Sequence, residues 1–179
     1  MYYLFGFTTL LLAAAIVALF AMMGALKASI DAGEYGGGTV HVLPDVPAGH
    51  APDFIPESIG DLRGADRAVM LVLSTACSSC AEVARQLADE PRPVTAHDVF
   101  VVVSTPDRAT GDAFRGQPGL APLPCFVDEG GQWVSSEFNV RHSPSALVFR
   151  RGRLVSAMVF NDIATLRRAM ATSTKEVAA

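Results

Sequence analysis

Two long apolar runs, with a helical pattern between them, mark the first half of the globular part of the chain. Residues 67–75 (RAVMLVLST) and 98–104 (DVFVVVS) are almost continuously apolar, which is typical of strands that are covered on both faces. Between them, residues 81–89 carry apolar side chains at helical spacing, at Val83, Ala84 and Leu87. This order predicts a strand, a helix and a second strand, and a right-handed crossover makes the two strands a parallel pair.

The second half of the chain predicts a different order of elements. A short helix is expected over 110–115, followed by strands over 124–128, 146–150 and 154–160. An Arg-Gly pair separates the last two strands and predicts a hairpin. Asp162 is expected to cap a final helix that runs to about residue 172. The order β–α–β and then β–β–α predicts one α/β domain over residues 54–172, with a tail over 173–179.

The N-terminal segment has the composition of a membrane span. Residues 2–26 contain no charged residue and no proline. At about 1.5 Å per residue, a helix of this length reaches about 37 Å, against a hydrocarbon core of about 30 Å. We therefore predict a transmembrane anchor over residues 1–27. A cleaved signal peptide fits less well, because no basic residue precedes the run and no suitable pair of small residues follows it; a buried core helix is the third interpretation.

Residues 28–53 have the composition of a flexible tether. They include the triplet Gly36-Gly37-Gly38 and three prolines, with few large apolar residues. Glycines and prolines of this kind are typical of linkers and turns. A short strand over 39–43 is conceivable within this segment, between the glycines and Pro44.

The candidate chemistry lies in Cys77 and Cys80, which follow the first predicted strand and therefore stand at the N-terminus of the next helix. Residues three apart in a helical turn are about 5–6 Å apart, within the Cα separation of about 4.4–6.8 Å that a disulfide needs. Unpaired amides and the positive end of the helix dipole favour a thiolate. We expect Cys77, nearer the helix end, to attack and Cys80 to resolve.

Two structural interpretations of this motif are weaker. A zinc site would need two more ligands, and the remaining candidates form no finger-like pair: Cys125, His41, His50, His97 and His142. A purely structural disulfide across so short a loop would constrain the unfolded chain little. Redox chemistry is favoured, and neither a metal nor another cofactor is expected.

Four features of the chain resemble the thioredoxin superfamily, and within it the membrane-tethered TlpA/DsbE-like and MauD-like redoxins. They are the apolar strand that ends in Ser-Thr-Ala, the Cys-Ser-Ser-Cys at the helix start, the segment FNVRHSPSALVF at 138–149, and the closing hairpin and helix. The resemblance covers about residues 54–171. It implies a thioredoxin-like three-layer α/β sandwich and a cis peptide before Pro144. It also implies that Ser143 and Pro144 face the substrate beside the cysteines.

The chain departs from cytosolic thioredoxins at two places. Leu71 stands where they have a buried Asp six residues before the first cysteine. Ala76 replaces their Trp, and Ser78-Ser79 replace their Gly-Pro. Because related proteins range from about −270 to −120 mV, the resemblance does not fix the redox potential.

The cysteine pair and the resemblance predict a thiol–disulfide oxidoreductase that acts on protein thiols or disulfides. Because disulfides persist outside the cytosol, we expect an extracytoplasmic domain on a single-pass anchor. The positive charge of Lys27, just after the apolar run, mildly favours the opposite orientation. Expected partners are client proteins, the lipid bilayer and a membrane electron donor; a net charge of −4 argues against nucleic acid. The rivals are a tethered binding or assembly module with the same fold and a peroxidase-like redoxin.

Four further residues carry weaker signals. Cys125 follows Leu-Pro at a predicted strand start and is either a buried small apolar residue or a third redox thiol. His142 is either a surface histidine or a group that tunes the thiolate. Glu82 either relays protons or is a solvated partner of the helix dipole. Trp133 is expected to pack near a turn.

Overall fold

The structure of the protein is a computed structural model that describes residues 16, 19–20, 22, 40–89 and 97–176. None of the helices within these residues is long and apolar enough to cross a membrane. The predicted anchor over 1–27 lies almost wholly outside the described residues, and it stays a prediction. The predicted tether also lies outside them as far as residue 39.

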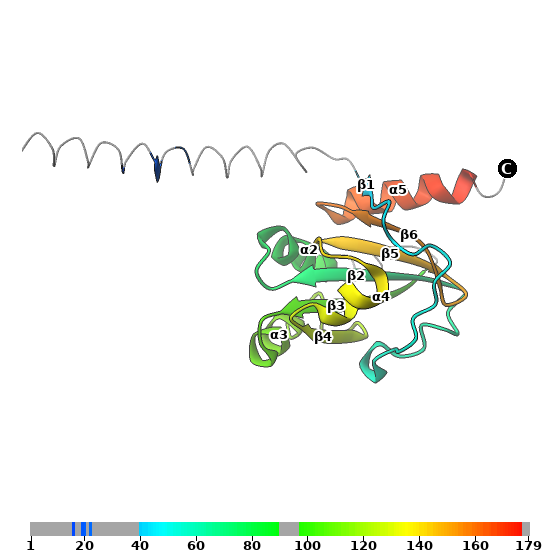
Figure 1. Cartoon of the computed structure of the whole chain (residues 1–179), viewed down its shortest axis with the longest axis horizontal. Coiled ribbons are helices and arrows are strands. Elements are labelled where there is room, and N and C mark those ends of the chain that lie inside the picture. Colours follow the sequence, from blue (N-terminus) through cyan, green and yellow to red (C-terminus); the bar gives the residue numbers. More distant parts are fainter. Residues whose placement is uncertain (1–15, 17–18, 21, 23–39, 90–96, 177–179) are drawn as a thin grey trace, which may run out of the picture. The chain divides into compact units, whose positions relative to one another are not determined.

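A six-stranded mixed sheet forms the centre of the fold (Figure 1). Its strands are β1 (His41–Val42), β2 (Arg67–Ser74), β3 (Asp98–Thr105), β4 (Cys125–Glu129), β5 (Ser145–Arg150) and β6 (Arg153–Val159). The order across the sheet is β1-β6-β5-β2-β3-β4. β2, β3 and β4 run parallel, while β5 is antiparallel to β2 and β6, and β1 is antiparallel to β6. The predicted parallel pair and the predicted hairpin are both confirmed.

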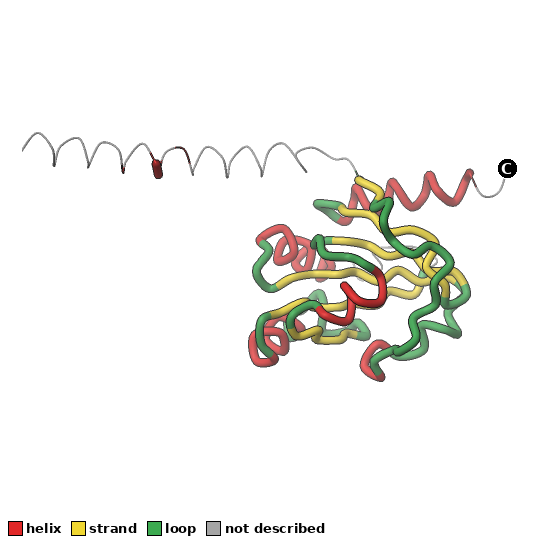
Figure 2. The backbone as a smooth tube through the Cα atoms, viewed as in Figure 1, coloured by secondary structure: helices red, strands yellow, loops and turns green. Residues whose placement is uncertain are grey.

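The helices of the described chain are a 3-10 turn η1 (Glu57–Ile59), α2 (Ser78–Asp89), α3 (Arg108–Arg115), α4 (Gln132–Phe138) and α5 (Ile163–Glu176). Most of the chain between β1 and β2 is loop, interrupted by η1 (Figure 2). Helix α5 begins as predicted, because Asp162 accepts a hydrogen bond of 2.8 Å from the backbone N–H of Thr165. It continues to Glu176, beyond the predicted end at residue 172.

Two hydrophobic cores, one on each face of the sheet, make this a three-layer arrangement. Along β2, successive side chains point to opposite faces, as the pleat requires. Leu71 and its neighbours two positions away pack with α2, α3 and α5. Met70 and Val72 pack on the other face with η1 and α4. Both faces of β2 are therefore buried, which explains its unbroken apolar sequence.

Helix α4 was not predicted, and its start depends on a side chain from the preceding strand. The carboxylate of Asp128, at the end of β4, accepts hydrogen bonds from the backbone N–H groups of Trp133 at 3.1 Å and Val134 at 3.0 Å. These bonds satisfy amides that a helix N-terminus leaves unpaired. The Trp133 ring packs edge to face against Phe126 and Phe138, which confirms the predicted packing role.

Residues 40–53 differ from the flexible tether predicted for them. β1 pairs with β6, and Leu43 donates a 2.8 Å backbone hydrogen bond to the carbonyl of Ala157. Gly49 and His50 exchange backbone hydrogen bonds with Leu154 at 2.7 and 2.8 Å. Several backbone groups of this segment thus find partners on β6 in spite of its three prolines. The short strand expected within 39–43 is confirmed at His41 and Val42.

Candidate active site

Cys77 stands immediately before α2, in the position of a helix cap. Its Sγ accepts a hydrogen bond from the backbone N–H of Cys80 at 3.3 Å. A side-chain acceptor at this position satisfies one of the free amides of the first helical turn. The loop between β2 and α2 is held by Ser74, whose carbonyl accepts from the N–H of Cys77 at 3.2 Å. The strand end and the helix start together fix where the first sulfur lies.

The two thiols of the pair differ in exposure and in acidity. Cys77 is half-buried, whereas Cys80 is fully buried; the structure shows both as free thiols. The hydrogen bond from the Cys80 thiol, followed by the backbone N–H groups of Cys80 and Ser79, lowers the pKa of Cys77 from 9.0 to about 6 against the opposing effect of burial. The same thiol–thiol hydrogen bond, together with burial, raises the pKa of Cys80 well above its ordinary value. Cys77 is therefore a thiolate near neutral pH, and Cys80 is a thiol.

The loop before β5 lies against the first cysteine. The peptide bond between Ser143 and Pro144 is cis, as the resemblance implied. The carbonyl oxygen of Ser143 lies 3.5 Å from the Sγ of Cys77. Pro144 is buried, and its carbonyl accepts from the N–H of Phe160 at 3.3 Å, which ties the loop to the end of β6. The structure thus brings Cys77, Cys80 and Ser143 together at one end of the sheet, with Pro144 directly behind Ser143.

Two of the weaker candidates have other roles in the structure. Cys125 is buried with 5% exposure in the core on the side of the sheet that α2, α3 and α5 cover, and burial raises its pKa to about 11, which fits the buried apolar residue rather than a third redox thiol. Glu82 is engaged by Arg85 and by Gln86 at 3.0 Å, and the hydrogen bond from Arg85 lowers its pKa. No group of three or more His, Cys, Asp or Glu side chains that could hold a metal occurs among the described residues.

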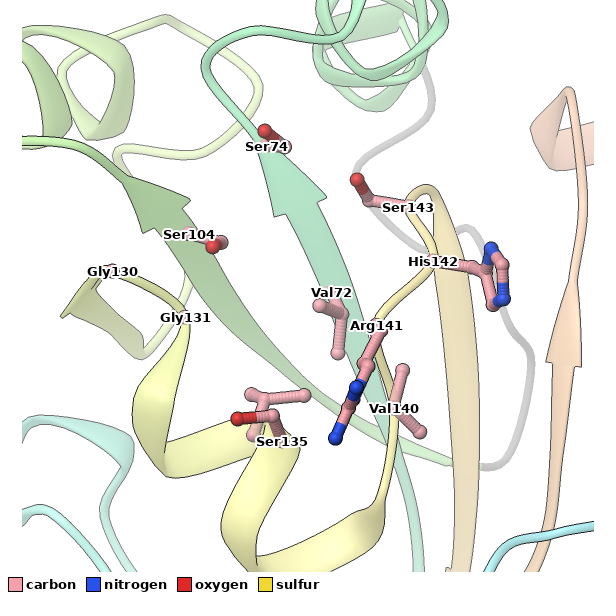
Figure 3. A pocket seen from close by; sticks show the side chains of 11 residues that line it. Val72, Ser74, Ser104, Gly130, Gly131, Ser135, Val140, Arg141, His142 and Ser143 are labelled. Atoms are coloured by element: carbon pink, nitrogen blue, oxygen red, sulfur yellow. The ribbon is translucent and has the colours of Figure 1, made fainter.

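A pocket of about 290 Å³ with both polar and apolar walls adjoins the loop that carries Ser143 (Figure 3). We call it the Arg141 pocket. Its walls come from the ends of β2 and β3, the start of α4 and the loop before β5: Val72, Ser74, Ser104, Gly130, Gly131, Val134, Ser135, Val140, Arg141, His142 and Ser143. Figure 3 shows the Arg141 side chain extending toward Ser135, while the His142 ring points away from Ser135 and Ser104. The sequence analysis missed this pocket, because no single stretch of sequence contains its walls.

The fold and site together define a class: this is a thioredoxin-like fold with a cysteine pair at a helix start. Among solved structures, the chain is similar to a domain of a possible thiol-disulfide isomerase from Cytophaga hutchinsonii, with a TM-score of 0.56 and 11% identity over 76% of this chain and 99% of that one. It is also similar to a candidate protein disulfide isomerase from Bacteroides thetaiotaomicron, with a TM-score of 0.51 and 15% identity over 77% and 92% of the two chains.

A third similar structure is a secreted Mycobacterium tuberculosis disulfide oxidoreductase homologous to E. coli DsbE, with a TM-score of 0.45 and 21% identity over 56% of this chain and 72% of that one. No family model matches the chain, and no curated protein matches it. At these identities the similarity establishes the thioredoxin-like fold.

Proposed function

We propose that the protein is a thiol–disulfide oxidoreductase that acts on protein clients through Cys77 and Cys80. The observation that carries the proposal is the unequal pair itself. Cys77 has a pKa of about 6, caps a helix and is half-buried, whereas Cys80 is buried and protonated. A sulfur that is nucleophilic at neutral pH beside a shielded partner is the arrangement that stepwise disulfide exchange requires.

In the reducing direction, the Cys77 thiolate attacks one sulfur of a client disulfide. The client S–S bond breaks, a mixed disulfide forms on Cys77, and the second client sulfur leaves as a thiolate that takes up a proton. Cys80 then loses its proton and attacks the Cys77 sulfur, which releases the first client sulfur as a second thiol. The client gains two electrons, and the protein becomes a Cys77–Cys80 disulfide. A dithiol donor returns those electrons, and the oxidising direction is the same sequence reversed.

The carbonyl of Ser143 lies beside the attacking sulfur, so in this proposal Ser143 receives the client backbone, and the buried Pro144 holds Ser143 in place. Client disulfides persist outside the cytosol, and a tether would keep the domain near exported proteins and near an electron donor in the membrane. The extracytoplasmic location, the bilayer and the donor are therefore parts of the proposal. They rest on the predicted anchor and on this chemistry.

The test uses the full chain in detergent, with insulin reduction by dithiothreitol as the assay. Cys80→Ser should accumulate mixed disulfides with clients, because attack survives and resolution is lost. Cys77→Ser should lose both activity and trapping. Cys125→Ser is the matched control, and it should behave as the unaltered protein because that thiol is buried elsewhere in the core.

Three results would contradict the proposal. Trapping by Cys77→Ser in place of Cys80→Ser would reverse the assigned roles. Loss of activity in Cys125→Ser alone would move the chemistry away from the pair. Full activity in both Cys77→Ser and Cys80→Ser would favour the tethered binding or assembly module.

A further inference from the structure

The lining of the Arg141 pocket carries a positive charge and no negative charge. Four serines, Ser74, Ser104, Ser135 and Ser143, are among its lining residues, and none of the lining residues is acidic. Arg141 is the cation of the lining, is exposed, and forms no ion pair with any described residue. The acid nearest to Arg141 in the sequence, Glu137, bonds instead to His50 at 3.2 Å and to the backbone N–H of Asp53 at 3.1 Å. Asp128 has both carboxylate oxygens bonded to amides of α4. The lining thus contains a guanidinium and no carboxylate.

Arg141 is positively charged, whereas the chain as a whole has a net charge of −4. In a net acidic protein, a guanidinium with no partner beside hydroxyl groups marks a place where an anion is locally favoured. The planar fork of an arginine suits a carboxylate, which can accept two parallel hydrogen bonds from it. A pocket of about 290 Å³ is at the lower end of the range for small-molecule sites, so it suits one side chain better than a bulky cofactor.

The pocket is connected to the cysteine pair through one residue. Ser143 lines the pocket, and its carbonyl oxygen lies 3.5 Å from the Sγ of Cys77. An extended polypeptide advances about 3.3 Å per residue, with alternate side chains on the same face. A client whose cysteine is attacked by Cys77 would therefore bring the side chain two residues away, on the same face, into the region of the pocket.

We propose that the Arg141 pocket is a specificity site for an Asp or Glu side chain of the client, about two residues from the attacked cysteine. This inference rests on the proposed oxidoreductase function and narrows its substrates to clients that are acidic beside the target disulfide. Arg141 binds the client carboxylate and takes no part in the electron transfer. The hydroxyls of Ser74 and Ser104 supply further hydrogen bonds to the same group, since Ser135 already donates to the carbonyl of Gln132.

The experiment measures single-turnover exchange between the reduced full chain in detergent and three synthetic disulfide peptides. The peptides are identical except for Glu, Gln or Lys two residues from the cysteine. The unaltered protein should react with the Glu peptide about fivefold faster than with the Lys peptide, which corresponds to about 1 kcal/mol for a partly screened charge pair. The Gln peptide should fall between the two. Arg141→Glu should reverse the order of the Glu and Lys peptides.

The matched control is Arg150→Glu, which makes the same charge change at the far end of β5. Five residues of strand separate it from Ser145 by about 17 Å, beyond a Debye length of about 8 Å at physiological salt. This variant should keep the preference for the Glu peptide. The rates are compared as ratios within one sample, so a variant that is partly unfolded still gives a valid order.

The outcomes separate this inference from the proposed function. Equal rates for all three peptides, or a preference for Glu that survives in Arg141→Glu, would overturn the pocket assignment while exchange itself continues. Loss of the preference in Arg150→Glu as well would show a general effect of net charge, and would also overturn it. No exchange with any peptide, including the neutral Gln peptide, would overturn the proposed function on which the inference depends.

Discussion

We expect Cys77 to react with disulfides faster than an ordinary thiol at acidic pH and more slowly at basic pH. The pH at which the two reaction rates are equal tests how far the pKa of Cys77 is lowered. The pKa of its thiol is about 6, against an ordinary value of 9.0. At pH 7, roughly 90% of Cys77 is therefore thiolate, compared with about 1% of an ordinary thiol. The direction follows from the sign of the shift, because a lowered pKa extends the nucleophilic form toward lower pH.

A less basic thiolate is also a weaker nucleophile, and this sets the size of the effect. With a Brønsted slope of about 0.45, lowering the pKa from 9.0 to about 6 reduces the intrinsic reactivity about 20-fold. The net advantage of Cys77 is then about fourfold at pH 7 and about 40-fold at pH 5. At pH 9 it is about tenfold slower than the ordinary thiol, and the two rates cross between about pH 7.5 and 8.

The assay is attack of the reduced full chain on 2-hydroxyethyl disulfide, a neutral reagent, with acid quenching and mass spectrometry of the peptide that contains Cys77 and Cys80. A cysteine peptide with an ordinary pKa is the reference. Cys80→Ala removes the largest cause of the lowered pKa, so its profile should move toward the reference. Cys125→Ala should leave the profile unchanged. A rate that keeps rising from pH 7 to pH 9 would refute the reasoning.

Three other predictions concern packing and location. Gly119→Ala should lower the free energy of unfolding by about 2 kcal/mol, because its Cβ would overlap the backbone of Ala84 in α2. Gly116→Ala, where the added Cβ lies 3.4 Å from the nearest atom, is the control; equal denaturant midpoints for the two variants would contradict this. The full chain should stay in the membrane after carbonate washing, and a soluble form beginning near Ala28 would contradict the anchor. A phosphatase fused after Ala179 should be active, whereas activity of only a cytoplasmic reporter would place the domain inside.

The strands could be predicted from sequence wherever burial alone determines the pattern. Strands β2 and β3 lie in the middle of the sheet between two helical layers, so almost every position is apolar, and their predicted bounds agree with the structure within a residue. Helix α4 could not be predicted in this way. It has seven residues, and its start depends on the carboxylate of Asp128, which belongs to the preceding strand. Local helical spacing does not reveal a cap of this kind.

Segments that depend on distant partners were the least predictable. Residues 40–53 read as part of a tether because three prolines interrupt them and a glycine triplet precedes them, yet the segment is held by β1 pairing with β6 and by bonds to Glu137, far along the sequence. The candidate site shows the same contrast. Cys77 and Cys80 are adjacent to one helix start and could be recognised from spacing, whereas the Arg141 pocket is assembled from separate segments that only the fold brings together.

The hydrogen bond between the two thiols also sets the order of attack in the proposed cycle. It is the largest cause that lowers the pKa of Cys77 and the largest that raises the pKa of Cys80. Once Cys77 is joined to a client sulfur, its Sγ carries no negative charge to hold the Cys80 proton. Burial still raises the pKa of Cys80, while hydrogen bonds from Ser74 and Ser143 lower it. The pKa of Cys80 therefore falls when Cys77 has reacted, which activates the resolving sulfur without the carboxylate that cytosolic thioredoxins have in place of the fully buried Leu71.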